Sequence, residues 1–211
     1  MHGLCVWNFT MAFLSEHFSR GVVATAQAVD WSIAESVVAE LAALRARGGR
    51  LFILGLGGSA GNASHMTNDM RKLAEIEAYA PTDNVSELTA RINDDGWGAA
   101  MVGWLRASRL NAADAVFVLS VGGGDAERGV STELVTAMDY ALEVGSPILG
   151  IVGRDGGHAA RVGKAVVVVP PLDAGLVTPL AEAFQAVIWH GLVTHPELAA
   201  ASPHWESLDR Q

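Results

Sequence analysis

Cysteine is almost absent from the 211 residues, and basic side chains are scarce. Cys5 is the only cysteine, which excludes an internal disulfide and a thiolate metal cluster within one chain. The 14 lysines and arginines are outnumbered by 23 aspartates and glutamates, giving a formal charge of −9. Sequence-independent binding to nucleic acid depends on Lys and Arg neutralising phosphates, so this balance argues against it. Any anionic ligand must be bound by groups within its own site, because the chain as a whole is negatively charged.

Long apolar runs and targeting signals are also missing. No run reaches the roughly 18 residues that a membrane-spanning helix needs. The start, MHGLCVWNFTMAFLSEHF, has no basic leader and no small-residue cleavage site. We therefore expect a cytoplasmic protein without a membrane partner. Residues 1–10 show no periodic pattern, which makes Met11 a candidate for the true start.

Half of the residues are apolar and 18% are charged, a normal globular composition, and the length suits one α/β domain. In residues 11–47 the apolar positions recur at spacings of three and four, which predicts two helices or one broken helix. Ser32 and Glu35 are spaced as a capping box at the junction. We expect these helices to precede an α/β core over 48–195 and a polar tail over 196–211.

Strands and helices alternate through the expected core. Short β-branched apolar runs predict buried parallel strands, and helical periodicity predicts the segments between them. This alternation predicts a doubly wound α/β sheet whose ligands bind at the carboxyl ends of the strands. Strands are expected at 51–54, 115–119, 147–152 and 165–169, with 76–80 as a weaker fifth, and helices at 59–73, 84–92, 97–109, 131–144 and 178–194.

Two glycine-rich loops each follow a predicted strand and precede a predicted helix. In the first, GLGGS at 55–59, free N–H groups at a helix start and the Ser59 hydroxyl suit a phosphate, and a tight turn capped by Ser59 is an equal alternative. The second loop, SVGGGD at 120–125, suggests one ligand held from both sides. Asp125 would repel a phosphate there, and Arg128 could offset that charge.

Nucleotide binding is a competing interpretation of the first loop. Gly55, Gly57 and Ala60 fit the short dinucleotide pattern G-x-G-x-x-[GA]. The acidic residue that such a site needs about 20 residues later has no clear candidate, so a nicotinamide-dependent oxidoreductase is the weaker hypothesis. A Walker A loop is excluded, because no Gly-Lys-Ser/Thr occurs.

Histidines and carboxylates recur at helical spacing. His65 and Asp69 are four residues apart, so on a helix they lie on one face. Glu182 and His190 are eight apart, on one row of the last predicted helix. If the two helices converge, two histidines and two carboxylates form a set that suits zinc or a similar divalent ion. On spacing alone, a surface His–Asp hydrogen bond and a solvated helix edge are the more common outcomes.

Five blocks of the sequence match the pattern of one family. They are GLGGSAGNASHMTNDM, RINDDGWG, SVGGGD, VGRDGGHAARVGKAVVVVP and AEAFQAVIWH. In order and spacing they resemble the sugar isomerase (SIS) domain of the phosphoheptose isomerases, over roughly residues 15–195. The resemblance implies a five-stranded parallel sheet flanked by helices in three flavodoxin-like layers, with an N-terminal helical extension. It also implies a homotetramer with active sites at the subunit interfaces.

The function implied by the resemblance is an aldose–ketose isomerase of a phosphorylated sugar, converting sedoheptulose 7-phosphate to a heptose 7-phosphate for heptose and cell-envelope synthesis, often with zinc. The family's ligand pattern, His-x₃-Glu and Gln-x₇-His, falls on His65, Asp69, Glu182 and His190, with Asp in place of Glu and Glu in place of Gln. Asp69 is then the first-choice base and His190 its acid/base partner, while the metal polarises the carbonyl.

Substrate binding is implied at both loops and at one further block. Where the family has Ser-Thr-Ser-Gly-Asn-Ser, only Ser120 keeps a hydroxyl here, whereas Asn93 and Asp94 match the family's Asn-Asp. A non-catalytic SIS module, which senses a sugar phosphate or binds a protein partner, is the alternative function. The implied substrate-binding residues are Gly57, Gly58, Ser59, Asn93, Asp94, Ser120, Gly122, Gly123, Gly124 and Arg128.

Overall fold

The computed structural model describes residues 13–201, so Met11 and the last ten residues of the tail lie outside the described residues. Five parallel strands form one sheet in the order β2-β1-β3-β4-β5, which confirms the predicted doubly wound α/β class. β1, β3 and β4 are buried along their whole length, as unbroken apolar runs require. The strands are β1 (Leu51–Gly55), β2 (Ala78–Tyr79), β3 (Ala115–Ser120), β4 (Ile148–Gly153) and β5 (Ala165–Val169).

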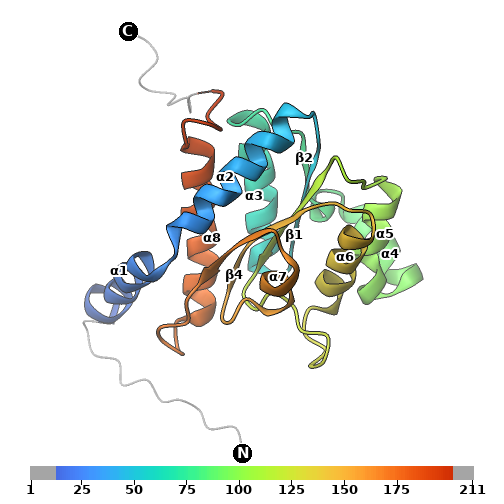
Figure 1. Cartoon of the computed structure of the whole chain (residues 1–211). Helices are drawn as coiled ribbons and strands as arrows, with labels where there is room; N and C mark the ends of the chain where they lie inside the picture. Colours follow the sequence, from blue (N-terminus) through green and yellow to red (C-terminus); the bar gives the residue numbers. More distant parts are fainter. Residues whose placement is uncertain (1–12, 202–211) are drawn as a thin grey trace, which may run out of the picture.

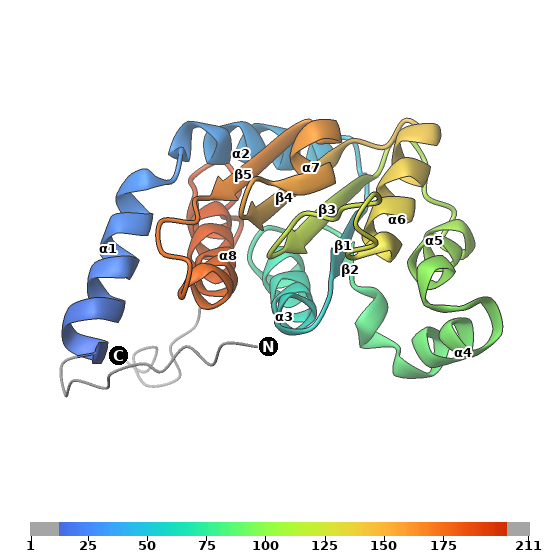
Figure 2. The ribbon, with the colours of Figure 1, turned by 90° about the horizontal axis from the view of Figure 1, so that it is seen from below.

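Helices cover both faces of the sheet and complete three layers (Figures 1 and 2). Two hydrophobic clusters mark the two faces, one between the sheet and α2, α3 and α8, the other between the sheet and α5, α6 and α7. None of the helices within residues 13–201 has the length and apolarity to cross a bilayer. Their bounds are α2 (Trp31–Ala46), α3 (Gly58–Lys72), α5 (Trp97–Ala107), α6 (Thr132–Glu143), α7 (Gly157–Val162) and α8 (Val177–Thr194).

The N-terminal extension is a broken helix, as its periodicity predicted. A π-helical turn (Phe13–Phe18) leads into α1 (Ser19–Ala28), which projects from the body of the domain (Figure 1). The expected capping box at Ser32 is wrong, because α2 begins at Trp31 and Ser32 therefore lies within its first turn. Asp30 caps the helix instead, and the hydrogen bond from the Ser32 hydroxyl lowers the pKa of the Asp30 carboxyl.

Both glycine loops lie at the carboxyl edge of the sheet, as the sequence predicted. The chain reverses so tightly after β1 that a Cβ atom on Gly55 would lie 2.3 Å from the carbonyl oxygen of Ser59. Glycine is therefore required at the point where β1 ends and α3 begins. α4 (Val85–Asp95) follows a 3₁₀ turn (Pro81–Asp83) and packs on α5, away from α3 and α8 (Figure 2).

The second glycine loop is docked onto the start of α7. The carbonyl oxygens of Gly123 and Gly124 accept hydrogen bonds from the N–H groups of Ala159 (2.9 Å) and His158 (2.8 Å). Gly157 has a φ of +54°, and a Cβ atom on it would lie 2.2 Å from the carbonyl oxygen of Gly122. The second glycine loop and the start of α7 therefore approach so closely that a side chain at Gly157 would separate them.

Candidate active site

A nearly buried carboxylate lies between the last turns of α3 and α8. Asp69 has a side chain only 9% exposed. Its Oδ2 accepts a hydrogen bond from the indole Nε1 of Trp189 at 3.2 Å, and its Oδ1 accepts one from Asn68 at 3.0 Å. Because Trp189 belongs to α8 and Asp69 to α3, the docking of these two helices fixes the position of the carboxylate.

Two histidines flank the same carboxylate oxygen. The Nε2 atom of His65 lies 3.5 Å from Oδ2 of Asp69, and that of His190 lies 3.3 Å from it. The two imidazole rings are 5.2 Å apart, edge to face, and their side chains are 56% and 48% exposed. Solvent therefore reaches the histidines, whereas the carboxylate is held underneath them.

These three side chains form a donor set of the kind that holds a catalytic metal ion. Each of His65, Asp69 and His190 offers one ligand atom, and the three atoms lie within 4.8 Å of one another. Two imidazole nitrogens and one carboxylate oxygen match the three protein ligands of a catalytic zinc site, whose fourth position is left for water or substrate. The residues thus fit a divalent ion of the zinc type.

The fourth implied ligand lies elsewhere on α8. Glu182 precedes His190 by eight residues, about 12 Å along a helix that rises 1.5 Å per residue. Its carboxylate lies against Gly58, because a Cβ atom there would be 2.5 Å from Oε2 of Glu182. α3 has no acidic residue of its own in its first turn, so the Glu182 carboxylate provides the negative charge at the start of this helix.

Ser59 and two residues that the sequence analysis did not identify form a buried polar network beside this carboxylate. Gln185 is fully buried, donates a hydrogen bond to the Ser59 hydroxyl (3.0 Å) and accepts one from Asn62 (2.7 Å). Asn62 also donates to the backbone oxygen of Glu182 at 3.0 Å. The signal that could have revealed Gln185 is its polar side chain within an otherwise apolar stripe of the last helix.

The second loop uses its hydroxyl internally. Ser120 Oγ accepts the N–H groups of Gly122 (3.3 Å) and Gly123 (3.0 Å), which shapes the turn after β3. Arg128 is turned toward Asp125, with its Nε 3.5 Å from the carboxylate, and its backbone N–H is bonded to the same side chain. The Ser120 hydroxyl, Asp125 and Arg128 are therefore paired with other groups of the same loop.

Two of the implied substrate-binding residues lie outside this region. Asn93 and Asp94 are in α4, where the Asn93 amide donates a hydrogen bond to Asp94 at 2.8 Å. α4 packs against α5 at the far side of the domain from α8 (Figures 1 and 2). Within this one chain they do not join the His65, Asp69 and His190 group.

Known proteins resemble this chain in both sequence and structure. The phosphoheptose isomerase of Rhodospirillum rubrum is 31% identical over 144 residues, which cover 66% of this chain and 72% of that protein. The lincomycin biosynthesis protein LmbN of Streptomyces lincolnensis is 28% identical over 155 residues, 69% of this chain, and the matched part is about half (54%) of that protein. No family model matches the sequence.

Solved structures agree with these relatives. The phosphoheptose isomerase GmhA of Neisseria gonorrhoeae superposes with a TM-score of 0.67 at 25% identity. The match covers 87% of this chain and 97% of that one, so the two chains share their overall architecture.

Proposed function

The chain belongs to the phosphoheptose isomerase family of SIS-domain phosphosugar isomerases, and from that premise we propose that it interconverts sedoheptulose 7-phosphate and an aldose heptose 7-phosphate through an enediol. The observation that carries this proposal is the convergence of two histidines on one oxygen of the shielded Asp69 carboxylate. An aldose–ketose isomerase requires a base and an acid side by side, together with a means of stabilising negative charge on oxygen.

The mechanism assigns proton transfers to two side chains. Asp69 removes a proton from C1 of the ketose, and the electron pair of that C–H bond forms the enediol double bond. His190 donates a proton to the O2 oxygen and accepts one from O1, and Asp69 then returns its proton to C2. Trp189 and Asn68 hold the carboxylate during this cycle through their hydrogen bonds to its two oxygens.

We propose Zn²⁺ or another divalent ion as the cofactor, which His65, Asp69 and His190 would hold. An atom bound to the ion cannot carry a proton at the same time, so the ligand atoms of Asp69 and His190 would have to leave the ion when these side chains transfer protons. When bound, such an ion polarises the substrate carbonyl and stabilises the charge that develops on its oxygen. Glu182 is not grouped with these three residues and stays a predicted ligand, from its helical spacing to His190 and from the family pattern.

Metal binding is expected to depend on the histidines. Metal-free protein should bind one Zn²⁺ per chain, and His65→Ala should weaken binding at least about a hundredfold, because even the outer partners of metal ligands are worth ten- to a hundredfold. Competition with a chromogenic chelator measures the affinity. His158→Ala is the matched control, since His158 also contacts an aspartate, Asp139, at 2.8 Å. Equal affinities for the two variants would contradict the proposed ligand set.

Proton exchange with solvent tests the reaction itself. Protein loaded with zinc and incubated with sedoheptulose 7-phosphate in D₂O should place deuterium at C2 of the aldose and, through the reverse reaction, at C1 of the ketose, and NMR detects both labels. A screen of five- to seven-carbon sugar phosphates identifies the preferred chain length. Absence of exchange in every sugar phosphate would instead favour the non-catalytic SIS module, an alternative supported by the internal hydrogen bonds of the Ser59 and Ser120 hydroxyls.

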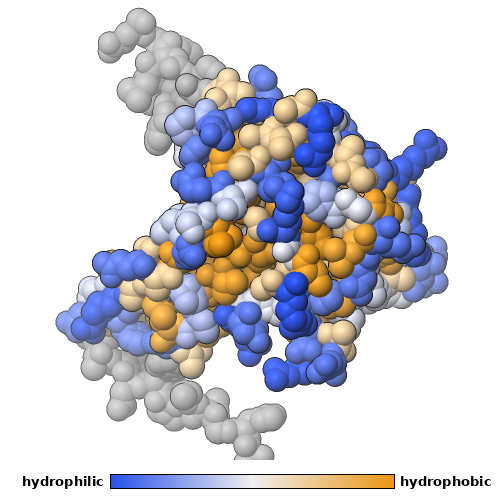
Figure 3. Space-filling view, in the orientation of Figure 1, coloured by the Kyte–Doolittle hydropathy of each residue, from blue (hydrophilic) through white to orange (hydrophobic). Residues whose placement is uncertain are grey.

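We further propose that the chain forms a homotetramer in the cytoplasm, with active sites between subunits. Exposed apolar side chains on the N-terminal helices and α8 support association, among them Leu14, Val23 and Val187. Apolar residues also gather near the middle of the face seen in Figure 3. The acidic composition gives no support for a nucleic-acid partner.

A further inference from the structure

A cavity of about 410 Å³ opens at the carboxyl edge of the sheet beside the second glycine loop. Its wall is built from the loops after β3, β4 and β5, together with α7 and the start of α8. Val177 lies in this wall, thirteen residues before His190 on α8, or about 20 Å along the helix axis. The cavity is therefore separate from the His65, Asp69 and His190 group of the same chain.

Arginine dominates the charge of this cavity. Arg128, Arg154 and Arg161 line it, together with Asp125 and Asp155. The Asp125 carboxylate is paired with Arg128. Within residues 13–201, by contrast, no hydrogen bond or ion pair engages the guanidinium of Arg154 or of Arg161. Three arginines and two aspartates thus give the lining an excess of one positive charge in a chain whose formal charge is −9, and among the described residues Arg154 and Arg161 are its two guanidinium groups without an ion pair.

The backbone holds Arg154 in an unusual conformation. Its φ is +56°, a left-handed value that side chains other than glycine rarely adopt. The side chain lies over the second glycine loop, where its Cδ is 3.7 Å from the position of a Cβ atom on Gly122. Strained residues of this kind cluster at ligand-binding sites, because the surrounding structure must fix them. The strain here keeps a cation at the cavity wall.

The start of α8 adds a second positive element. α8 has 18 residues, begins at the cavity wall with Val177, and has no side chain capping its first turn. Its N-terminal end therefore carries the partial positive charge of the helix dipole together with free N–H groups. The start of α3 differs, because the Glu182 carboxylate already lies there and would repel an incoming anion.

We propose that this arginine cavity binds a phosphate group. A guanidinium can hold phosphate oxygens through two parallel hydrogen bonds, a geometry that a compact ammonium group cannot provide. The ligand is a phosphate monoester or inorganic phosphate. Only the expectation that a sugar phosphate supplies this group rests on the proposed function. Binding itself is a property of the cavity and can be measured without turnover.

Titration of the full-length protein with inorganic phosphate, followed by calorimetry, tests the site directly. Arg154→Gln combined with Arg161→Gln should raise the dissociation constant at least about tenfold, because hydrogen bonds to charged groups are strong. Arg154→Gly keeps the test valid if that pair of changes unfolds the protein. Glycine adopts a positive φ freely, so this variant should keep or raise the melting temperature while weakening phosphate binding.

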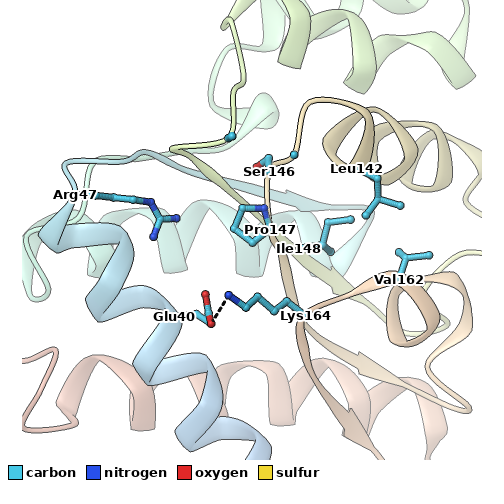
Figure 4. A pocket seen from close by; sticks show the side chains of 10 residues that line it. Glu40, Arg47, Leu142, Ser146, Pro147, Ile148, Val162 and Lys164 are labelled. Carbon is cyan, nitrogen blue, oxygen red and sulfur yellow. Dashed lines mark ion pairs between the residues drawn. The ribbon is translucent and has the colours of Figure 1, made fainter.

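A second basic cavity provides the matched control. At the opposite edge of the sheet, a cavity of about 590 Å³ is lined by Arg47 and Lys164, and Lys164 pairs with Glu40 at 2.8 Å (Figure 4). Arg47→Gln combined with Lys164→Gln should leave phosphate binding unchanged. Phosphate binding that is undetectable at millimolar concentration, or that is lost in this control and retained in the arginine variants, would overturn the proposal.

Isomerase kinetics then identify the source of the phosphate. If the group belongs to the substrate, the arginine variants raise KM for the sugar phosphate by the factor found for inorganic phosphate and leave kcat unchanged. If the ligand is separate, KM stays constant and inorganic phosphate still binds at saturating sugar phosphate. A protein that lacks isomerase activity but binds phosphate through Arg154 and Arg161 would refute the proposed function and retain this site.

Discussion

Asp69→Asn is expected to lower kcat/KM by about a thousandfold, the range that positioned acid–base groups contribute, while the protein remains folded. Asparagine keeps the size of the side chain and can still accept the hydrogen bond from Trp189, which lies 3.2 Å from Oδ2. It cannot take a proton from carbon, and it removes the only carboxylate in the His–Asp group. Steady-state kinetics with sedoheptulose 7-phosphate measure the loss, and circular dichroism checks the fold.

Asp139→Asn is the matched control for this variant. Asp139 also contacts a histidine, since its Oδ1 lies 2.8 Å from Nε2 of His158, but it lies on α6 and is outside the His–Asp group. The control should keep wild-type activity. Full activity in Asp69→Asn would contradict the proposed base. His190→Ala is also expected to lose isomerase activity, and full activity in that variant would contradict the proposed acid/base partner.

Gly157→Ala is expected to destabilise the protein by about 3 kcal/mol or more, the upper part of the range for single substitutions. The added Cβ atom would lie 2.2 Å from the carbonyl oxygen of Gly122 and 2.6 Å from that of Gly124. Both are backbone atoms, so relief of the clash requires the loop after β3 to move away from α7. Denaturant unfolding measures the free energy of unfolding.

Gly129→Ala separates the effect of this clash from the effect of backbone conformation. Gly129 has a similar left-handed φ, +66°, but no atom lies within 4 Å of where its Cβ would be. Its loss should be limited to the left-handed penalty of about 1–2 kcal/mol for a residue with a side chain. An equal loss of stability in both variants would show that Gly157 is not required by the close approach between the loop after β3 and the start of α7.

The sheet could be predicted from the sequence because its strands are buried on both faces. β1, β3 and β4 then appear as continuous apolar runs, and each of their bounds lies within one residue of the predicted one. β2 is harder to detect, since it is a two-residue edge strand that pairs only with β1. The six-residue helix α7 is too short for its periodicity to be recognised.

The candidate site was predictable only where one helix determines it. The spacing of His65 and Asp69 fixes their common face, whereas the approach of His190 depends on how α3 and α8 dock. Two residues on the same row of α8 need not contact the same site. Glu182 lies about two turns before His190, and its carboxylate lies at the start of α3. The role of Gln185 depends on a partner 126 residues away, which no local pattern contains.

The hydrogen bond between Trp189 and Asp69 joins residues 120 positions apart in the chain. A contact across so long a stretch of chain is slow to form, because the entropy of closing the intervening loop opposes it. α8 follows all five strands in the chain and supplies His190, so the His–Asp group cannot form before this helix has docked on α3. Proton exchange at the sugar would therefore begin only when the last helix has docked, and catalytic activity would report complete folding rather than folding of the sheet.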